Sequence, residues 1–255
     1  MGERVDLNAD LGEGFGAWAM GADEALLAYV TSANVACGFH GGDPTVIDRT
    51  VARAVRAGVA VGAHPGHFDL RGFGRREIAA DPAEVEADVL YQVGAVAAFA
   101  RAHGSHLTHV KPHGALYNQA VRDETLARAI ARGVARFSRD LVFVGLAASA
   151  AMRRAAEAEG LRFAAEAFAD RAYDAEGRLV PRSRPGALIT DPASAAAKAL
   201  RIVRDRAVVS IDGAEVPMRA DTLCLHGDNP HALAIARAVR EALEGAGVSV
   251  QALPR

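Results

Sequence analysis

The chain has 255 residues, 51% of them hydrophobic and 24% charged, with a formal net charge of −2 at pH 7. This balance is typical of a globular protein and excludes an intrinsically disordered one. The basic residues are scattered, which argues against nucleic acid as a partner. The apolar stretches are too short to span a membrane, and the charged start of the chain does not resemble a signal peptide. Because Cys37 and Cys224 lie far apart and indicate no disulfide framework, we expect a cytoplasmic protein that does not associate with membranes.

Short β-rich runs alternate with Ala-rich amphipathic segments along the whole chain. The runs predict strands at 4–10, 33–39, 59–64, 107–113, 141–147, 161–168, 222–228 and 248–253. Helical periodicity fills the intervals, and an Asx–Pro pair marks helix starts at Asp43-Pro44, Asp81-Pro82, Asp191-Pro192 and Asn229-Pro230. This repetition predicts a mostly parallel sheet with helical crossovers, and no linker divides the chain, so we expect a single domain over 1–255.

Two segments depart from the strand–helix repetition. The charged, turn-rich stretch 169–186 is typical of a lid or binding loop, and 208–221 predicts a small hairpin. An open nucleotide-binding sheet is disfavoured, because the glycines after the first strand do not lead directly into a helix and no GxxxxGK[ST] motif occurs. We therefore expect an α/β fold that is a TIM-like (β/α) barrel of seven or eight strands.

Polar residues collect at the carboxyl ends of the predicted strands, the edge where α/β barrels build active sites. They are Asn8, Asp10, Glu13, His40, His64, His109, Lys111, His113, Glu166, Asp170, Arg171, His226 and Asp228. Because side chains two apart share a strand face, Asn34 falls on the inward face with His40, whereas Cys37 falls on the outward face. Buried polar groups are costly unless paired, so we expect the inward set to form one connected network.

These residue types suit acid–base chemistry. Asp10 and Glu13 form a carboxylate pair, and Lys111 shares a strand face with His113. Three inward histidines with Asp10 are also able to bind a divalent ion, but no HExxH motif occurs and the ligands would come from different strands, so the metal content stays open. An arginine-rich loop follows His64 and is either ordinary surface or an anion-binding loop, through Arg71, Arg75 and Arg76.

Six segments, in this order, resemble the LamB/YcsF family: "DLNADLGEGFG" (6–16), "SANVACGFHGGDP" (32–44), "GAHPGHFDLRGFGRR" (62–76), "VKPHGALYN" (110–118), "EAFADRAY" (166–173) and "LHGDNPHA" (225–232). The resemblance runs from end to end. It implies a distorted barrel akin to glycoside hydrolase and deacetylase folds. It also implies the activity of the A component of 5-oxoprolinase, the ATP-dependent opening of 5-oxo-L-proline (pyroglutamate) to L-glutamate together with partner subunits B and C.

The resemblance carries the family's motif positions onto Asn8, Asp10, Glu13, Asn34, His40, His64, Lys111, His113, Asp170, Arg171, His226 and Asp228. For lactam hydrolysis we expect Asp10 or Glu13 to activate water. Lys111 with His113 is expected to stabilise an oxyanion or a transferred phosphate, and His40 or His64 to protonate the ring nitrogen. The substrate-binding set is expected to be Asn8, Asn34, Arg75, Arg76, Asn118, Glu166, Asp170, Arg171, His226 and Asp228, with one of the arginines clamping the substrate carboxylate.

No P-loop is present in the sequence, so we expect ATP to be bound largely through the partner subunits or in an unrecognised mode. Two alternatives remain. One is a stand-alone metal-dependent deacetylase or amidohydrolase, which the barrel type and the inward histidines favour. The other is a non-enzymatic regulatory barrel that binds a sugar or an amino acid. The second is less favoured, because a binding protein does not need several acid–base groups at one mouth.

Overall fold

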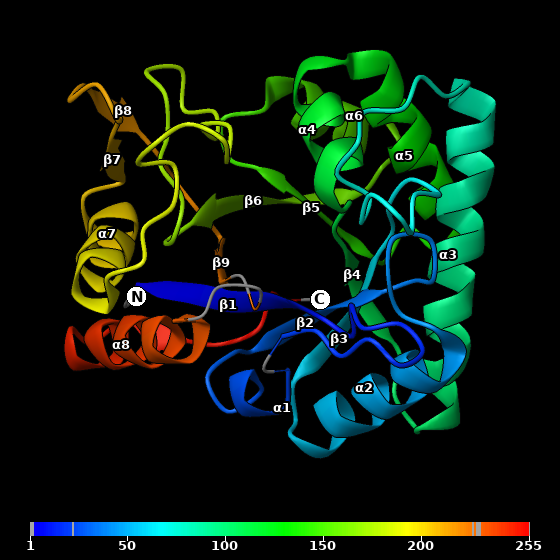
Figure 1. Ribbon diagram of the computed structural model, residues 1–255. Coiled ribbons are helices and arrows are strands. Elements are labelled where there is room, and N and C mark those ends of the chain that lie inside the picture. Colours follow the sequence, from blue (N-terminus) through cyan, green and yellow to red (C-terminus); the bar gives the residue numbers. More distant parts are fainter. Residues whose placement is uncertain (1–2, 22, 226, 228–230, 255) are drawn as a thin grey trace.

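The computed structural model describes residues 3–21, 23–225, 227 and 231–254. Within them, seven parallel strands close into a barrel, because the last of the seven pairs with both the sixth and the first (Figure 1). In order around the barrel these are β1 (Arg4–Leu11), β2 (Ser32–Ala36), β3 (Ala60–His64), β4 (Leu107–Val110), β5 (Val142–Leu146), β6 (Arg162–Phe168) and β9 (Thr222–Leu225). The predicted TIM-like barrel is confirmed, and its strand number is seven. A short strand, β10 (Ser249–Val250), adds to β1.

Helices cover the outside of the barrel, with α7 and α8 side by side at one edge and the long α3 at the other (Figure 1). They are α1 (Asp23–Leu26), α2 (Pro44–Arg56), α3 (Pro82–Ala102), α4 (Gly114–Arg122), α5 (Glu124–Phe137), α6 (Ala150–Ala158), α7 (Pro192–Arg204) and α8 (Ala232–Gly245). In the described part of the chain, no helix combines the length and the apolar character needed to cross a membrane.

The predicted Asp–Pro helix starts are confirmed. The Asp43 carboxylate accepts hydrogen bonds from two backbone N–H groups of the first turn of α2, at 2.8 and 3.1 Å, and Pro44 opens the helix. Asp81 and Asp191 cap α3 and α7 in the same way. The fourth predicted start, Asn229-Pro230, lies outside the described residues.

The strands turn polar side chains inward and apolar side chains outward. On β1, Val5, Leu7, Ala9 and Leu11 are buried against the helices in the main hydrophobic cluster. Cys37 belongs to this same cluster, where its thiol donates to the carbonyl of Val35 at 3.2 Å, and burial raises its pKa. Cys37 is therefore a core residue, as the alternation predicts.

Several strands end earlier than the sequence predicts, and β2 and β4 are two of them. β2 stops at Ala36, and Gly38, with φ of 98°, starts a turn in which its N–H donates to the carbonyl of Gly41 at 2.8 Å. His40 therefore reaches the barrel interior from a turn. Its predicted placement on the strand was wrong, although the side chain does point inward as predicted. β4 stops at Val110, but the next residues stay extended, because the Lys111 N–H donates to Ala63 at 3.0 Å.

The two segments outside the strand–helix repetition form structures of their own. β7 (Ala207–Val209) and β8 (Glu215–Pro217) pair antiparallel, which confirms the predicted hairpin. The chain after β6, from 169 to 190, arches over the carboxyl ends of the strands (Figure 1). That position makes it part of the wall of a cavity at the barrel mouth.

Candidate active site

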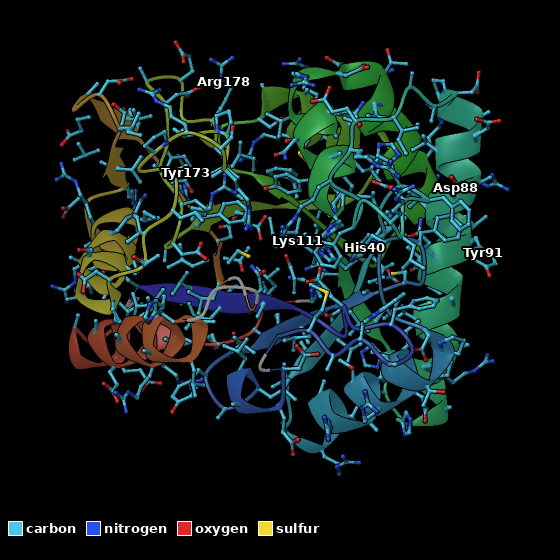
Figure 2. The ribbon with its side chains drawn as sticks, viewed as in Figure 1. His40, Asp88, Tyr91, Lys111, Tyr173 and Arg178 are labelled. Atoms are coloured by element: carbon cyan, nitrogen blue, oxygen red, sulfur yellow. The ribbon has the colours of Figure 1, made fainter. Side chains whose placement is uncertain are left out.

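A cavity of about 560 Å³ opens at the carboxyl ends of the barrel strands. The residues that line it include Asp10, Glu13, His64, Arg75, Lys111, His113, Tyr117, Asn118, Phe168, Arg171, Arg178 and Arg182. Figure 2 shows Lys111 and His40 near the barrel axis and Arg178 in the arch above. A second cavity, of about 370 Å³, lies at the opposite end of the strands, where barrels are built for stability rather than chemistry. The first cavity is the candidate active site.

A hydrogen-bonded network fills the barrel beneath this cavity. Asn34 Nδ2 donates to Asn8 Oδ1 at 2.7 Å and to Asp10 Oδ1 at 2.8 Å. Asn8 Nδ2 in turn donates to Glu166 Oε1 at 3.1 Å. Asp10 and Asn34 are direct partners in the pairing of β1 with β2, so the strand register itself brings their side chains together. The inward polar residues thus form the connected network that their burial predicts.

Lys111 is the cation at the centre of this network. Its Nζ lies 2.9 Å from Asp10 Oδ1 and 3.0 Å from Glu166 Oε1, and the residue is only 2% exposed. Burial alone would lower the pKa of Lys111, but the Asp10 and Glu166 carboxylates outweigh it and hold that pKa well above its usual value. Nζ also lies 3.0 Å from the Cys224 sulfur, a contact that the sequence did not indicate. Lys111 is therefore a fixed positive charge at the cavity wall.

His109 supports the network from below. Its Nε2 lies 2.8 Å from Asn34 Oδ1, and burial with the nearby Lys111 charge lowers its pKa to about 3. The neutral ring rests on Gly62, the direct strand partner of His109, where a β-carbon would lie 2.2 Å from Nε2. Gly62 thus leaves the space that the ring occupies.

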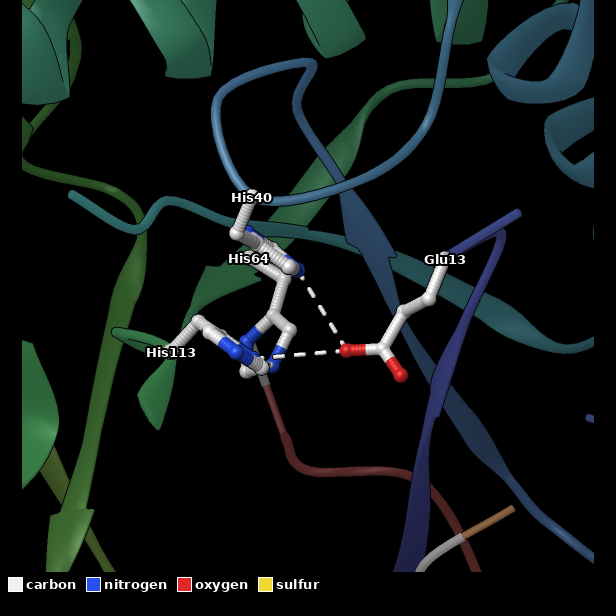
Figure 3. Close-up of side chains that lie close together, drawn as sticks. All are labelled: Glu13, His40, His64 and His113. Atoms are coloured by element: carbon white, nitrogen blue, oxygen red, sulfur yellow. Dashed lines mark hydrogen bonds and ion pairs between the residues drawn. The ribbon is translucent and has the colours of Figure 1, made fainter. Parts of the chain in front are cut away.

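Above the network, a carboxylate meets three imidazoles (Figure 3). Glu13 Oε1 lies 3.3 Å from His40 Nε2 and 3.3 Å from His113 Nδ1. His113 Nδ1 lies 3.0 Å from His64 Nε2, and the rings of His40 and His113 stack with centroids 3.6 Å apart. One ligand atom from each of these four residues lies within 4.8 Å of the others, so the group is able to hold a metal ion. The sequence had assigned the carboxylate of such a group to Asp10, whereas the structure places Glu13 there.

The four groups differ in charge. Burial lowers the pKa of His40 to about 3 and also lowers the pKa of His113, with the neighbouring histidines adding to the effect. Burial alone would raise the pKa of Glu13, but its close contacts with His113 and His40 outweigh burial and lower that pKa. The Glu13 carboxylate therefore faces the neutral imidazoles of His40 and His113.

Asp10 links the cluster to the Lys111 network. Its Oδ1 forms an ion pair with Lys111 Nζ, and its Oδ2 lies 3.3 Å from His64 Nε2. The two groups of residues are therefore one continuous site, with a fixed cation on one side and the imidazole–carboxylate cluster on the other.

The mouth of the cavity is rich in arginine. Arg75 and Arg171 line it, together with the exposed Asn118. Arg171 is buried, its Nη2 donates to the carbonyl of Val180 at 2.6 Å, and burial with the Arg182 charge lowers its pKa to about 10. A cationic mouth suits an anionic substrate.

Several predicted substrate-binding residues do not line this cavity. The Arg76 guanidinium pairs instead with the buried Asp69 carboxylate, so its predicted role as a substrate clamp finds no support in the geometry. Asp170 is buried at the start of the arch. Asn8, Asn34 and Glu166 lie below the cavity and act on it through Lys111 and Asp10. His226 and Asp228 lie outside the described residues.

Tyr117 and Phe168 are among the residues of the cavity wall that were missed from the sequence. Tyr117 follows His113 by one helical turn at the start of α4, and burial with the nearby Glu166 raises its pKa well above the usual value. Phe168 lies two residues after Glu166 on β6, and its ring centroid is 5.4 Å from Lys111 Nζ. Helical and strand periodicity from the neighbouring polar residues would have found both.

Comparison with known proteins gives a consistent result. The sequence matches the profile of the LamB/YcsF family over residues 5–255. A Chloroflexus aggregans protein, named as the A subunit of 5-oxoprolinase, is 56% identical over 247 residues, which cover 97% of this chain and 98% of that protein. The crystal structure of a lactam utilization protein from Thermus thermophilus has a TM-score of 0.93 at 56% identity, and covers 98% of this chain and 100% of its own. The T48 deacetylase, with a TM-score of 0.50 at 13% identity over 98% of this chain and 87% of its own, shares the fold alone. This chain belongs to the LamB/YcsF family.

Proposed function

We propose that this chain is the A subunit of a 5-oxoprolinase and takes part in the ATP-dependent hydrolysis of 5-oxo-L-proline to L-glutamate. The name of the Chloroflexus aggregans relative, at 56% identity over nearly the full length of both chains, supports the proposal. The observation that carries it is the buried Lys111 cation, which lies beside the Asp10 carboxylate and the imidazole cluster in one cavity. A cavity of about 560 Å³ has room for a small cyclic amide.

Hydrolysis of a lactam needs a base for the attacking water, positive charge near the developing oxyanion and a proton for the leaving nitrogen. Asp10 is the proposed base, since its carboxylate lies at the cavity wall between Lys111 and His64. The fixed charge of Lys111 stabilises the oxyanion without any rearrangement during the reaction. The proton that Asp10 takes from the water is then available for the leaving ring nitrogen, and His64 and His113 hold the Asp10 and Glu13 carboxylates in place.

The substrate's own carboxylate is proposed to bind at the cationic mouth. Arg75 and Arg171 line the cavity there, and a guanidinium matches a carboxylate in geometry as well as charge. Arg178 also faces this opening, but it already pairs with Asp174 at 2.9 Å and is the weaker candidate.

ATP is proposed to bind jointly with partner subunits B and C. The guanidinium groups of Arg75, Arg171 and Arg182 at the mouth suit phosphate oxygens, so this chain is able to contribute to the site. The nucleotide would supply a phosphoryl group that makes the amide a better electrophile. Within this chain, the same residues would hold and orient the reacting groups.

The test is a reconstitution. The purified chain, alone and with subunits B and C of a related 5-oxoprolinase operon, is given 5-oxoproline with and without ATP, and glutamate and ADP are measured. We expect both products only when all subunits and ATP are present. Glutamate made by this chain alone without ATP would favour the alternative of a stand-alone amidohydrolase. Tight binding of 5-oxoproline without turnover in any combination would favour the alternative of a regulatory binding protein.

A further inference from the structure

Several buried polar atoms in the cluster of Glu13, His40, His64 and His113 have no hydrogen-bond partner. Among the residues that the structure describes, Glu13 Oε1 and both ring nitrogens of His40 are buried and form no hydrogen bond. His40 itself is 0% exposed. Buried polar atoms in native proteins are nearly always paired, so Glu13 Oε1 and His40 Nε2, which face each other at 3.3 Å, indicate a missing partner.

The backbone fixes which nitrogens of the other two rings face the cluster. His64 Nδ1 lies 2.7 Å from the carbonyl oxygen of Lys111, and His113 Nε2 lies 2.9 Å from the carbonyl oxygen of Phe73. A carbonyl oxygen only accepts hydrogen bonds, so each of these nitrogens carries its ring's proton. The opposite nitrogens, His64 Nε2 and His113 Nδ1, therefore present lone pairs to each other at 3.0 Å.

Two lone pairs at this distance, with a carboxylate oxygen beside them, repel one another unless a cation lies between them. A proton is a poor candidate, because each ring already carries one on its far nitrogen and a second would create a buried cation. A metal ion suits the site better, since the neutral imidazole is the form that binds metals and a hydrogen bond from its other nitrogen to a carbonyl is the usual means of orienting such a ligand.

The spacing of the atoms agrees with this. Four ligands at about 2.0–2.1 Å from a tetrahedral zinc ion lie about 3.3 Å from one another. Three of the six distances between the facing atoms are 3.3 Å from Glu13 Oε1 to His40 Nε2, 3.3 Å from Glu13 Oε1 to His113 Nδ1, and 3.0 Å from His113 Nδ1 to His64 Nε2. One ligand atom from each of the four residues lies within 4.8 Å of the others.

The loop behind the cluster is shaped to fit it closely. Phe73, whose carbonyl orients His113, has a φ of 55°, a strained value for a residue that is not glycine. A β-carbon on Gly74 would lie 2.7 Å from His40 and 2.8 Å from His113, so only glycine fits there. Strained backbone of this kind concentrates at functional sites, where the surrounding structure holds it in place.

We propose that Glu13 Oε1, His40 Nε2, His64 Nε2 and His113 Nδ1 bind one divalent first-row transition-metal ion of the zinc class. Three imidazoles and a carboxylate favour such an ion over Ca²⁺ or Mg²⁺, which prefer oxygen ligands. Glu13, His64 and His113 line the cavity, so the ion faces the substrate pocket, where it is able to polarise a carbonyl group or a water molecule. Asp10 lies between the ion and Lys111 and separates the two positive charges.

Metal binding is measured on the whole chain, whether or not it hydrolyses 5-oxoproline. The protein is stripped with a chelator and titrated with Zn²⁺ and Co²⁺, with metal content by mass spectrometry and the visible absorption of bound Co²⁺ as readouts. The variants are Glu13→Gln, which keeps the shape of the side chain, and His40→Ala, which breaks no hydrogen bond. His103→Ala is the matched control, because that partly exposed histidine pairs with Asp48 away from the site.

We expect the wild-type chain and His103→Ala to bind one ion each. Both cluster variants should bind at least ~100-fold more weakly, since even residues that only orient metal ligands cost 10–100-fold. Circular dichroism shows whether each variant is folded, and Glu13→Gln keeps the test decisive if His40→Ala is not. A folded wild-type chain that takes up no stoichiometric ion would overturn the proposal. So would equal affinity in folded Glu13→Gln and wild type, or an equal loss in His103→Ala.

Discussion

His113 Nδ1 lies 3.0 Å from His64 Nε2, although the two residues are 49 positions apart in the sequence. The contact follows from strand pairing that continues past the end of β4, where the His113 N–H donates to the carbonyl of Pro65 at 2.8 Å. The other nitrogen of each ring donates a hydrogen bond to a backbone carbonyl, so the two facing nitrogens carry no proton and are acceptors. The backbone thus fixes the direction of both lone pairs before any ligand arrives.

Replacing Lys111 by methionine should abolish activity in the reconstituted complex. The fixed charge is lost, and removing one stabilising group from an oxyanion site costs ~100- to 1,000-fold in kcat. The Asp10 and Glu166 carboxylates would also lose their counter-ion, which destabilises the fold by about 3–5 kcal/mol.

The double variant Lys111→Met with Glu166→Gln separates these two effects. It removes the negative charge of Glu166 along with the positive charge of Lys111. The double variant should therefore have a higher free energy of unfolding than Lys111→Met, while its activity stays low. Glutamate formation and urea denaturation measure the two quantities. Near-normal glutamate formation by either folded variant would remove Lys111 from the mechanism.

Arg75→Gln should raise the KM for 5-oxoproline roughly tenfold or more, with a smaller effect on kcat. A charge-assisted hydrogen bond contributes about 1.5–3 kcal/mol, and Arg75 lines the cavity mouth. Arg76→Gln should change KM little, because its guanidinium pairs with Asp69. Steady-state kinetics on both variants decide between the neighbouring arginines, and a larger KM effect from Arg76 would contradict this assignment.

Stability should fall in acid because His109 is buried in its neutral form. Its pKa in the folded protein, about 3, lies below the ordinary value of 6.5, so between these pH values the unfolded chain binds more protons. The free energy of unfolding therefore decreases as pH falls through this window, by up to about 1.4 kcal/mol per pH unit from this group.

His109→Gln removes the titrating group and should flatten the pH dependence by that amount. The measurement is urea denaturation of both proteins at several pH values from neutral to the acid limit of solubility. Identical slopes for the two proteins would mean that His109 titrates in the folded chain as it does in the unfolded one.

Gly62→Ala should destabilise the fold, because the new β-carbon would lie 2.2–2.4 Å from atoms of the His109 ring. Overpacking of this kind costs about 1–3 kcal/mol. Gly94→Ala is the control: Gly94 lies within α3, and its β-carbon would meet nothing within 4 Å. There we expect a gain of about 0.5–1 kcal/mol from helix propensity. If Gly62→Ala were as stable as Gly94→Ala, the ring would have room to move that the packing does not indicate.

The sequence predicted the barrel and the starts of three of its helices. Alternating strand and helix signals needed only local periodicity, and the Asp–Pro starts of α2, α3 and α7 are fixed by contacts within a few residues. The inward polar face of β1 was equally readable, because successive side chains on a strand point to opposite faces. Local periodicity was therefore sufficient to predict which strand residues face the barrel interior.

Local periodicity could not predict where side chains lie beyond the ends of the strands. His40 enters the site from the turn that Gly38 starts, so strand alternation, which ends with β2 at Ala36, does not govern the direction of its side chain. Arg76 and Arg75 are neighbours in one loop, and no local pattern indicates that Asp69 binds the first of them.

By itself the sequence determined the fold class, the family and the set of acid–base residues at one end of the barrel, since each of these depends on local order along the chain. Only the tertiary structure decided that Glu13 rather than Asp10 joins the three histidines, and that Asp10 instead bridges His64 and Lys111. The physical reason is that strand register and loop turns set distances of about 3 Å between residues far apart in sequence, and local periodicity carries no information about such distances.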